Sequence, residues 1–147
     1  MAQKISTDLK NYIINKAIVE AIAGTCGTAG TASINIYSGS QPATADAGTS
    51  GSLLCTISGI GWASGTGTTS GTAALASTTG YSGTATNTGT AGWARMETVG
   101  VGYNGNAATH RIDGDVGTAS TCTFVINVAA ITSGGVVSLL TAPVSMA

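Results

Sequence analysis

The chain has 147 residues and a formal net charge of −1, and 7% of its residues are charged, against about 25% in an ordinary soluble domain. Its mean hydropathy of +0.33 argues against intrinsic disorder, which accompanies low hydrophobicity and high net charge. The length fits one domain. The basic residues form no cluster that could bind phosphates, so we expect no nucleic-acid partner. They are Lys4, Lys10, Lys16, Arg95 and Arg111.

The sequence predicts no membrane association. The N-terminal residues MAQKIS continue with polar residues and lack the apolar core and cleavage site of a signal peptide. No segment reaches the roughly 18 apolar residues that a membrane-spanning helix needs. We therefore expect a protein made in the cytoplasm of its producing cell, with no membrane partner.

Residues 6–23 predict the one convincing helix, because their apolar residues recur at helical spacing. Ser6 or Thr7 can cap its start and Gly24 can end it. The apolar stripe is wide, so it either packs on its own domain or reaches a neighbouring subunit. The candidate assembly contacts on this stripe are Leu9, Ile13, Ile14, Ile18 and Ile22.

The next part of the chain predicts short strands and one long loop. Residues 33–37 alternate, with Ile34 and Ile36 on one face, as in a half-buried strand. The segment SGSQPATADAG, residues 38–48, predicts a loop because Pro and Gly interrupt strand pairing. Alternating apolar residues over 53–57 predict another strand, and residues 73–76 predict a weaker one.

Residues 84–103 alternate over a long stretch, with a bulge expected at Gly89 or Gly92. Trp93 and Arg95 would face one side of it. A turn at 104–105 predicts a hairpin that returns through residues 110–112. Asp113 and Gly114 predict a further turn.

Apolar residues at 122, 124, 126 and 128 indicate a strand that follows this turn. A turn at 133–135 and a strand over 136–140 come next, and Pro143 marks the end of regular pairing. About seven short strands behind one helix predict a mainly β chain, an antiparallel β-sandwich or jelly-roll-like domain. We therefore expect an N-terminal helical segment over 1–24 and the β domain over 25–147.

Two motifs have letters that suggest ligand binding. GVGYNG, residues 100–105, matches a dinucleotide-binding pattern, but strands on both sides of it predict a turn. Asp113 and Asp115 could approach one hard cation. The surrounding loop lacks further carboxylate ligands, so we interpret them as solvated side chains of a tight turn, with Arg111 near enough to pair with either.

Catalytic and zinc-binding patterns are missing from the sequence. Cys26, Cys55 and Cys122 form no C-x-x-C pair, and His110 is the single histidine, which makes a zinc site improbable. We interpret the cysteines as small buried hydrophobic residues. No nucleophile motif accompanies His110. We expect no catalytic residue, no metal and no cofactor, and therefore no enzyme.

Two residue sets suggest recognition of flat ligands. A ladder of alternating threonines resembles an ice-binding surface, but no repeat supports it, and Thr is simply a good strand former. Aromatic side chains could stack on carbohydrate, although in an aromatic-poor chain they are more simply core anchors. The threonines are Thr84, Thr86, Thr88 and Thr90, and the aromatic residues are Trp62, Trp93, Tyr81 and Tyr103.

The order of several segments from about Ile34 to the C-terminus resembles small virion proteins of tailed bacteriophages. The most specific pieces are IYSGSQPATADA, GWARM beside DGDVG, and the closing ITSGGVVSL. The resemblance implies a β-rich structural subunit, most similar to capsid decoration (cement) proteins on the head surface of the virion. It also implies the major capsid protein, or another virion protein, as partner.

Composition and resemblance together predict a protein that works within a larger assembly. A core with one Phe and two Trp is thin, and oligomerisation is one way for a small domain to compensate. We therefore expect a homo-oligomer, a trimer or dimer that matches the symmetry of a capsid lattice. A tail, neck or head-fibre component is the alternative within the virion, and a receptor- or carbohydrate-binding module is the alternative of another class.

Overall fold

The computed structural model describes residues 32–63, 72–75, 80–101, 107–142 and 144–145. The regular structure in these ranges is β throughout, which confirms the mainly β class. The helix expected over 6–23 lies outside them. The strands are β1 (Ala32–Ser38), β2 (Leu53–Ile60), β3 (Trp62–Ala63), β4 (Thr72–Leu75), β5 (Tyr81–Thr84), β6 (Gly89–Val101), β7 (Ala107–Gly117), β8 (Phe124–Ile126), β9 (Ala130–Ile131), β10 (Val136–Thr141) and β11 (Val144–Ser145).

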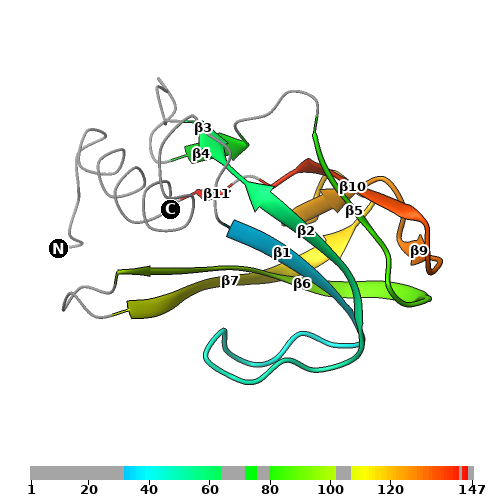
Figure 1. Ribbon diagram of the computed structural model, residues 1–147, viewed down its shortest axis with the longest axis horizontal. Coiled ribbons are helices and arrows are strands. Elements are labelled where there is room, and N and C mark those ends of the chain that lie inside the picture. Colours follow the sequence, from blue (N-terminus) through cyan, green and yellow to red (C-terminus); the bar gives the residue numbers. More distant parts are fainter. Residues whose placement is uncertain (1–31, 64–71, 76–79, 102–106, 143, 146–147) are drawn as a thin grey trace, which may run out of the picture.

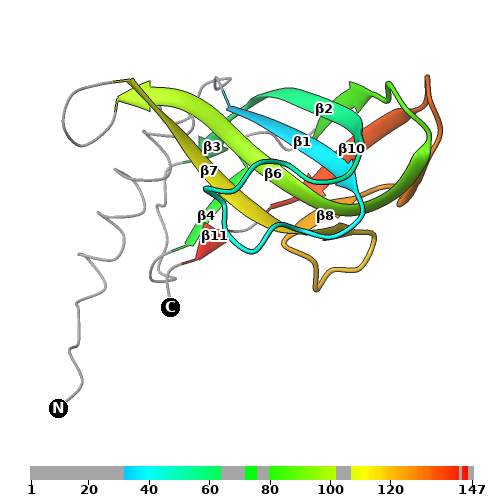
Figure 2. The same cartoon turned by 90° about the horizontal axis from the view of Figure 1, so that it is seen from below.

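The main sheet curls into a nearly closed barrel (Figures 1 and 2). Its strand order is β2-β1-β6-β7-β8-β10-β5, and β9 pairs with the start of β6. Pairing is antiparallel except between β7 and β8, which run parallel over Val116–Gly117. Strands β11, β4 and β3 form a separate small sheet. One curled sheet therefore forms most of the domain, where the strand count predicts an antiparallel β-sandwich or jelly-roll-like domain.

Strands β5 and β2 approach each other closely and nearly complete the barrel. Cys55 and Ala85 form an isolated antiparallel bridge, and the amide of Thr86 donates to the carbonyl of Leu54 over 2.9 Å. Gly83 permits this approach, because a Cβ there would lie 2.2 Å from the carbonyl oxygen of Thr56. A larger residue at 83 would push the two strands apart.

The core lies inside the barrel and follows the period-two alternation of the strands. On β1, Ile34 and Ile36 point inward, as the sequence predicts, and Ala94 and Met96 do so on β6. The buried aliphatic side chains of β2 and Phe124 from β8 belong to the same core cluster. The largest fully buried side chains in this interior are Ile34, Ile36, Leu54, Ile57, Ile60, Met96, Phe124, Ile126 and Ile131.

Several local predictions are confirmed. The loop expected over 38–48 separates β1 from β2, and the strand expected over 73–76 is β4. The 133–135 turn is present, with Gly134 at a φ of 83°, and β10 follows it. The bulge expected at Gly89 or Gly92 lies at Gly92, where the β1–β6 register slips between Tyr37–Trp93 and Ser38–Ala91.

Two local predictions are wrong. Asp113 and Gly114 form no turn: they lie within β7 and pair with Arg95 and Ala94 of β6. An ion pair with Arg95 makes the buried Asp113 tolerable within the strand. The expected alternating stretch over 84–103 is also interrupted, because β5 ends at Thr84 and β6 begins at Gly89.

Candidate interaction surface

The outer face of β6 carries polar side chains that bind one another and a loop of the chain. Alternation places Trp93, Arg95 and Glu97 on this face, opposite Ala94 and Met96. The prediction that Trp93 and Arg95 share one side is therefore confirmed. Both are nevertheless buried, so another part of the chain must cover them.

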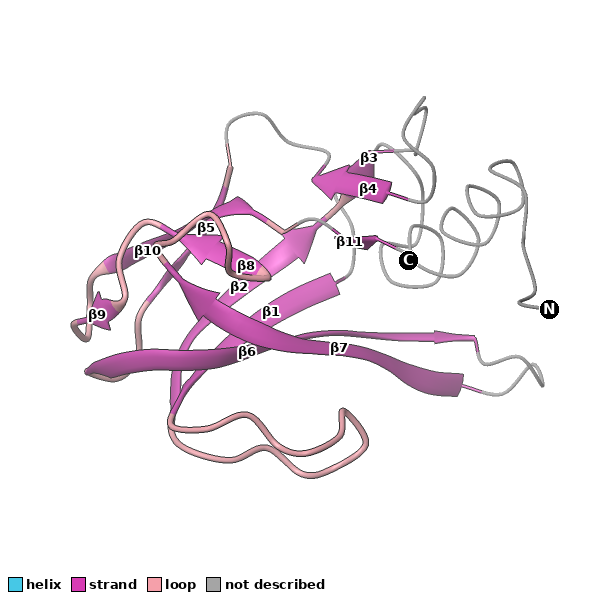
Figure 3. Cartoon of the chain, turned by 180° about the vertical axis from the view of Figure 1, so that it is seen from behind, coloured by secondary structure: helices cyan, strands magenta, loops and turns pink. Residues whose placement is uncertain are grey.

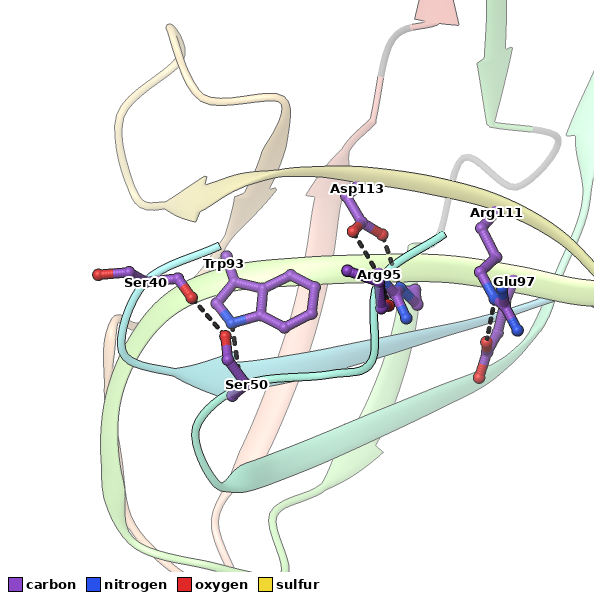
Figure 4. Close-up of polar contacts among 8 residues, drawn as sticks. Ser40, Ser50, Trp93, Arg95, Glu97, Arg111 and Asp113 are labelled. Atoms are coloured by element: carbon purple, nitrogen blue, oxygen red, sulfur yellow. Dashed lines mark hydrogen bonds and ion pairs between the residues drawn. The ribbon is translucent and has the colours of Figure 1, made fainter. Parts of the chain in front are cut away.

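The cover is the loop of residues 39–52, which we call the strap (Figure 3). The indole Nε1 of Trp93 donates to the carbonyl of Ser50 over 3.2 Å (Figure 4). Nη2 of Arg95 donates to the carbonyl of Ala47 over 3.1 Å. Gly92 lets the strap come close, because a Cβ there would lie 2.0 Å from the carbonyl oxygen of Gly39. Side chains of the barrel thus hold the strap by its backbone.

Beneath the strap, Arg95 forms a two-pronged ion pair with Asp113 of β7. Nε and Nη2 of Arg95 each lie 2.7 Å from one oxygen of the carboxylate, and both side chains are less than 5% exposed. Hydrogen bonding to Asp113 raises the pKa of Arg95 above its ordinary value, against the opposing effect of burial. The guanidinium lies 5.5 Å from the centre of the Trp93 ring, within range of a cation–π interaction.

Tyr37 of β1 completes the group under the strap. Its ring stacks on Trp93 with centroids 4.7 Å apart. Burial, followed by the negative charge of Glu97, raises the pKa of the Tyr37 hydroxyl. We call Tyr37, Trp93, Arg95 and Asp113 the strap cluster. The strap cluster is a buried group on the outer face of the sheet, separate from the core inside the barrel.

A row of polar side chains crosses four strands beside the strap cluster. Thr56 donates to Asn35 over 2.8 Å, and Asn35 donates to Glu97 over 2.9 Å. Arg111 on β7 lies 3.8 Å from the other carboxylate oxygen of Glu97 (Figure 4). Arg111 therefore pairs with Glu97, and neither Asp113 nor Asp115 is its partner.

Asp113 and Asp115 do not converge on a shared site. Asp113 faces Arg95, whereas Asp115 accepts hydrogen bonds from the amide and hydroxyl of Thr123. These bonds lower the pKa of Asp115 below its ordinary value. Across the described ranges, no group of three or more His, Cys, Asp or Glu side chains could hold a metal ion.

The wall of the barrel opposite the strap differs in chemistry. Every charged residue of the described ranges lies on the strap, β6 or β7. The outward side chains of β5 and β10 carry no charge, and Val136 and Leu140 among them are 60% and 55% exposed. We call this surface the uncharged wall. Its members are Ser82, Thr84, Val136, Ser138 and Leu140.

The predicted recognition residues whose side chains are described do not form a flat binding face. Thr86 and Thr88 lie in the connection between β5 and β6, so the four threonines share no strand. Trp93 is buried in the strap cluster. Tyr81 packs against the core, and its hydroxyl accepts a hydrogen bond from the amide of Gly61. The side chains of Trp62 and Tyr103 lie outside those described.

Among the described residues, Cys55, Cys122 and His110 form no group that could hold a metal ion. Cys55 is fully buried, and burial raises the pKa of its thiol. Cys122 is partly exposed, which differs from the buried position expected, and Cys26 lies outside the described residues. Within the described chain, Nε2 of His110 is a buried side-chain nitrogen without a hydrogen-bond partner.

The predicted assembly contacts Leu9, Ile13, Ile14, Ile18 and Ile22 lie outside the described residues. Sequence reasoning did not identify the strap cluster or the uncharged wall. Residues 80–91 and 116–142 contain no charged residue, and this feature of the sequence could have indicated the uncharged wall. The arrangement as a whole offers surfaces that can contact a partner, with the described charges engaged mainly among themselves.

Comparison with known proteins adds no assignment: the chain matches no protein family, no curated protein and no solved structure. Within the described part of the chain, no helix is long and apolar enough to cross a membrane.

Proposed function

We propose that the chain is a structural protein of a tailed-phage particle, a decoration protein that binds across neighbouring capsid subunits on the head. The observation that carries the proposal is the uncharged wall, where Val136 and Leu140 are largely exposed. The resemblance of the segments after Ile34 to phage virion proteins is the reason for proposing a phage particle as the assembly.

The described charged residues lie on the strap, β6 and β7 and none lies on the uncharged wall, which supports burial of that wall on assembly. Desolvating a charge without a partner is costly, whereas hydroxyl and aliphatic groups are transferred at much lower cost. The uncharged wall can therefore be covered by another protein without leaving a charge unpaired. Arg95 and Asp113 neutralise each other within the chain, so they do not oppose association with a partner of either charge.

A decoration protein needs only modest affinity at each contact. Binding to the assembled lattice alone stabilises that lattice by mass action. Many identical sites along a shell add avidity when copies are linked in an oligomer. A small barrel with uncharged outer strands meets both requirements.

Cryo-electron microscopy of the phage whose genome encodes this chain tests the proposal. The expected result is density for the barrel on the head surface, between capsomers and at high copy number. Density confined to the tail, neck or fibres would assign the chain to that part of the virion and contradict the decoration role. Absence from the particle, with binding on a glycan array, would favour a carbohydrate-binding module.

A surface variant tests the role of the uncharged wall. Val136→Asp with Leu140→Asp should weaken binding to heads stripped of the protein by at least about tenfold, because it places charge where partner contacts are desolvated. Thr118→Asp, at an exposed position outside β5 and β10, is the matched control and should bind as the wild type does. Equal binding by both variants would contradict the assigned surface.

A further inference from the structure

The β6–β7 hairpin extends beyond the strands that flank it. Strand β1 pairs with β6 only as far as Glu97, whereas β7 pairs with β6 as far as Val101. Figures 1 and 3 show the hairpin running out past the other coloured strands. A two-stranded ribbon in water is marginally stable by itself, and a third strand or other packing is needed to stabilise it.

The second edge of β7 is open over most of its length. Strand β8 pairs with it only at Val116 and Gly117. Thr123 covers the edge near Asp115, donating to its carboxylate from the amide over 2.9 Å, and lies against Gly114. Among the described residues, positions 107–113 have no strand partner on this side. We call this stretch the open edge.

The chemistry of the open edge specifies its partner. A strand edge presents a row of backbone N–H and C=O groups, and the group that satisfies such a row is another extended strand. Natural edges are usually protected by Pro, bulges or several charged residues. From 107 to 110 the open edge has no charge and no Pro, and its sequence is AATH.

His110 lies at the centre of the open edge and has an unusual environment. Its Nε2 is buried and lacks a hydrogen-bond partner in the described chain. Its partner on β6 is the buried Thr98, so its side chain lies on the inner face of the sheet. The groups that the open edge offers to a second strand are therefore the backbone groups of residues 107–113.

We propose that the open edge pairs with the open edge of a second copy, antiparallel about a two-fold axis at His110. This register matches residues 107–113 of one copy with 113–107 of the other and uses the whole edge. It sets Arg111 opposite Thr109 and Asp113 opposite Ala107, so no two like charges face each other. A two-fold contact of this kind is closed and yields a dimer.

Charge substitution at residue 109 tests the pairing and its register. Thr109→Glu places an acid opposite Arg111 of the second copy, and Thr109→Lys places a base there. Because symmetry counts each pair twice, the first should lower the dimer dissociation constant by about 2- to 30-fold and the second should raise it by a similar factor. Sedimentation equilibrium of the full chain measures both.

Thr44→Glu and Thr44→Lys, at an exposed position on the strap, are the matched controls and should leave the dissociation constant unchanged. Circular dichroism verifies that all four variants fold. A wild-type chain that stays monomeric at about 1 mM would overturn the proposal. So would Thr109→Glu and Thr109→Lys shifting the constant in the same direction, or neither shifting it.

Disulfide cross-linking gives a second test that does not depend on charge. His110→Cys, with Cys26 and Cys122 replaced by Ser, would bring two Cα atoms to about 4.5–5.5 Å at the axis, which suits a disulfide. Mild oxidation should yield a covalent dimer, and its absence would overturn the register. Both tests concern the isolated chain, so their failure leaves the proposed location on the phage head to be tested separately.

Discussion

The interior of the barrel and the strap cluster bury their side chains by different physical means. The interior is filled by aliphatic residues and Phe124, whose burial is favourable in any orientation that fills the space. The strap cluster buries an indole and an ion pair, and its stability depends on directed bonds from Trp93 and Arg95 to strap carbonyls. The first region should tolerate changes of shape, and the second should not tolerate loss of a partner.

This difference bears on function. The ion pair and the polar row engage four of the described charged residues on the strap side with partners inside the chain, and Asp115 accepts a hydrogen bond from Thr123. The uncharged wall on the other side stays free of charge. A chain built this way has little long-range electrostatic field and can pack closely against neighbours.

The largest expected effect is at Asp113. Asp113→Ala leaves Arg95 buried without its partner, and loss of one member of a buried pair costs about 3–5 kcal/mol. The free energy of unfolding from urea denaturation, followed by circular dichroism, measures the loss. Arg111→Ala is the control: its pair with Glu97 is one-third exposed, and its loss should cost about 1 kcal/mol or less. Equal losses for the two variants would remove the distinction between the cluster and the exposed row.

A smaller effect is expected at Gly92, beneath the strap. Gly92→Ala places a Cβ 2.0 Å from the carbonyl oxygen of Gly39, so the strap or β6 must shift, at a cost of about 1–3 kcal/mol. Gly48→Ala, on the strap itself, has no atom within 4 Å of the new Cβ. That control should leave stability unchanged or raise it by up to about 1 kcal/mol. Thermal unfolding of both variants measures the contrast, and a neutral Gly92→Ala would show that the strap is not held tightly.

Within the interior, a conservative change should have a moderate effect. Ile36→Val removes one methylene from a fully buried side chain and should cost about 0.5–1.5 kcal/mol. Val136→Ala on the uncharged wall removes more volume, two methyl groups in place of one methylene, but from an exposed side chain, so it should change stability by less than about 0.5 kcal/mol. Urea denaturation compares the two. If Val136→Ala lowered the free energy of unfolding more than Ile36→Val, the side chain of Val136 would have to be buried in a contact.

The smallest expected effect is a pH dependence at Asp115. Thr123 lowers the pKa of this carboxyl in the folded chain, so its carboxylate adds stability above the unfolded pKa of about 3.9. That contribution is lost as the pH falls through the folded pKa. Thr123→Val should therefore destabilise the chain at neutral pH and less so in acid, in denaturation curves at about pH 7 and pH 2.5. A loss that is equal at both pH values would contradict this role for the pair.

The local pattern of the sequence predicted much of the sheet and little of the strap cluster. Alternation is a local property, and it placed Ile34 and Ile36 on one face of their strand and Arg95 on the same side as Trp93. The burial of Arg95 depends on Ala47, 48 positions earlier, and no spacing rule connects them. The expected turn at Asp113–Gly114 was wrong for a related reason: local turn preference was overridden by pairing with β6. The curl of the sheet into a barrel likewise arises from the distant contact of β5 with β2.

A double-mutant cycle on Arg95 and Asp113 tests most directly whether the strap cluster depends on paired partners. The cycle compares Arg95→Met, Asp113→Leu and the double variant by urea denaturation. We predict that each single variant loses about 3–5 kcal/mol and that the double variant recovers most of this loss, because two apolar side chains leave no unpaired charge. Additive losses, with a coupling below about 0.5 kcal/mol, would contradict this and show that the strap cluster is stabilised as the interior is.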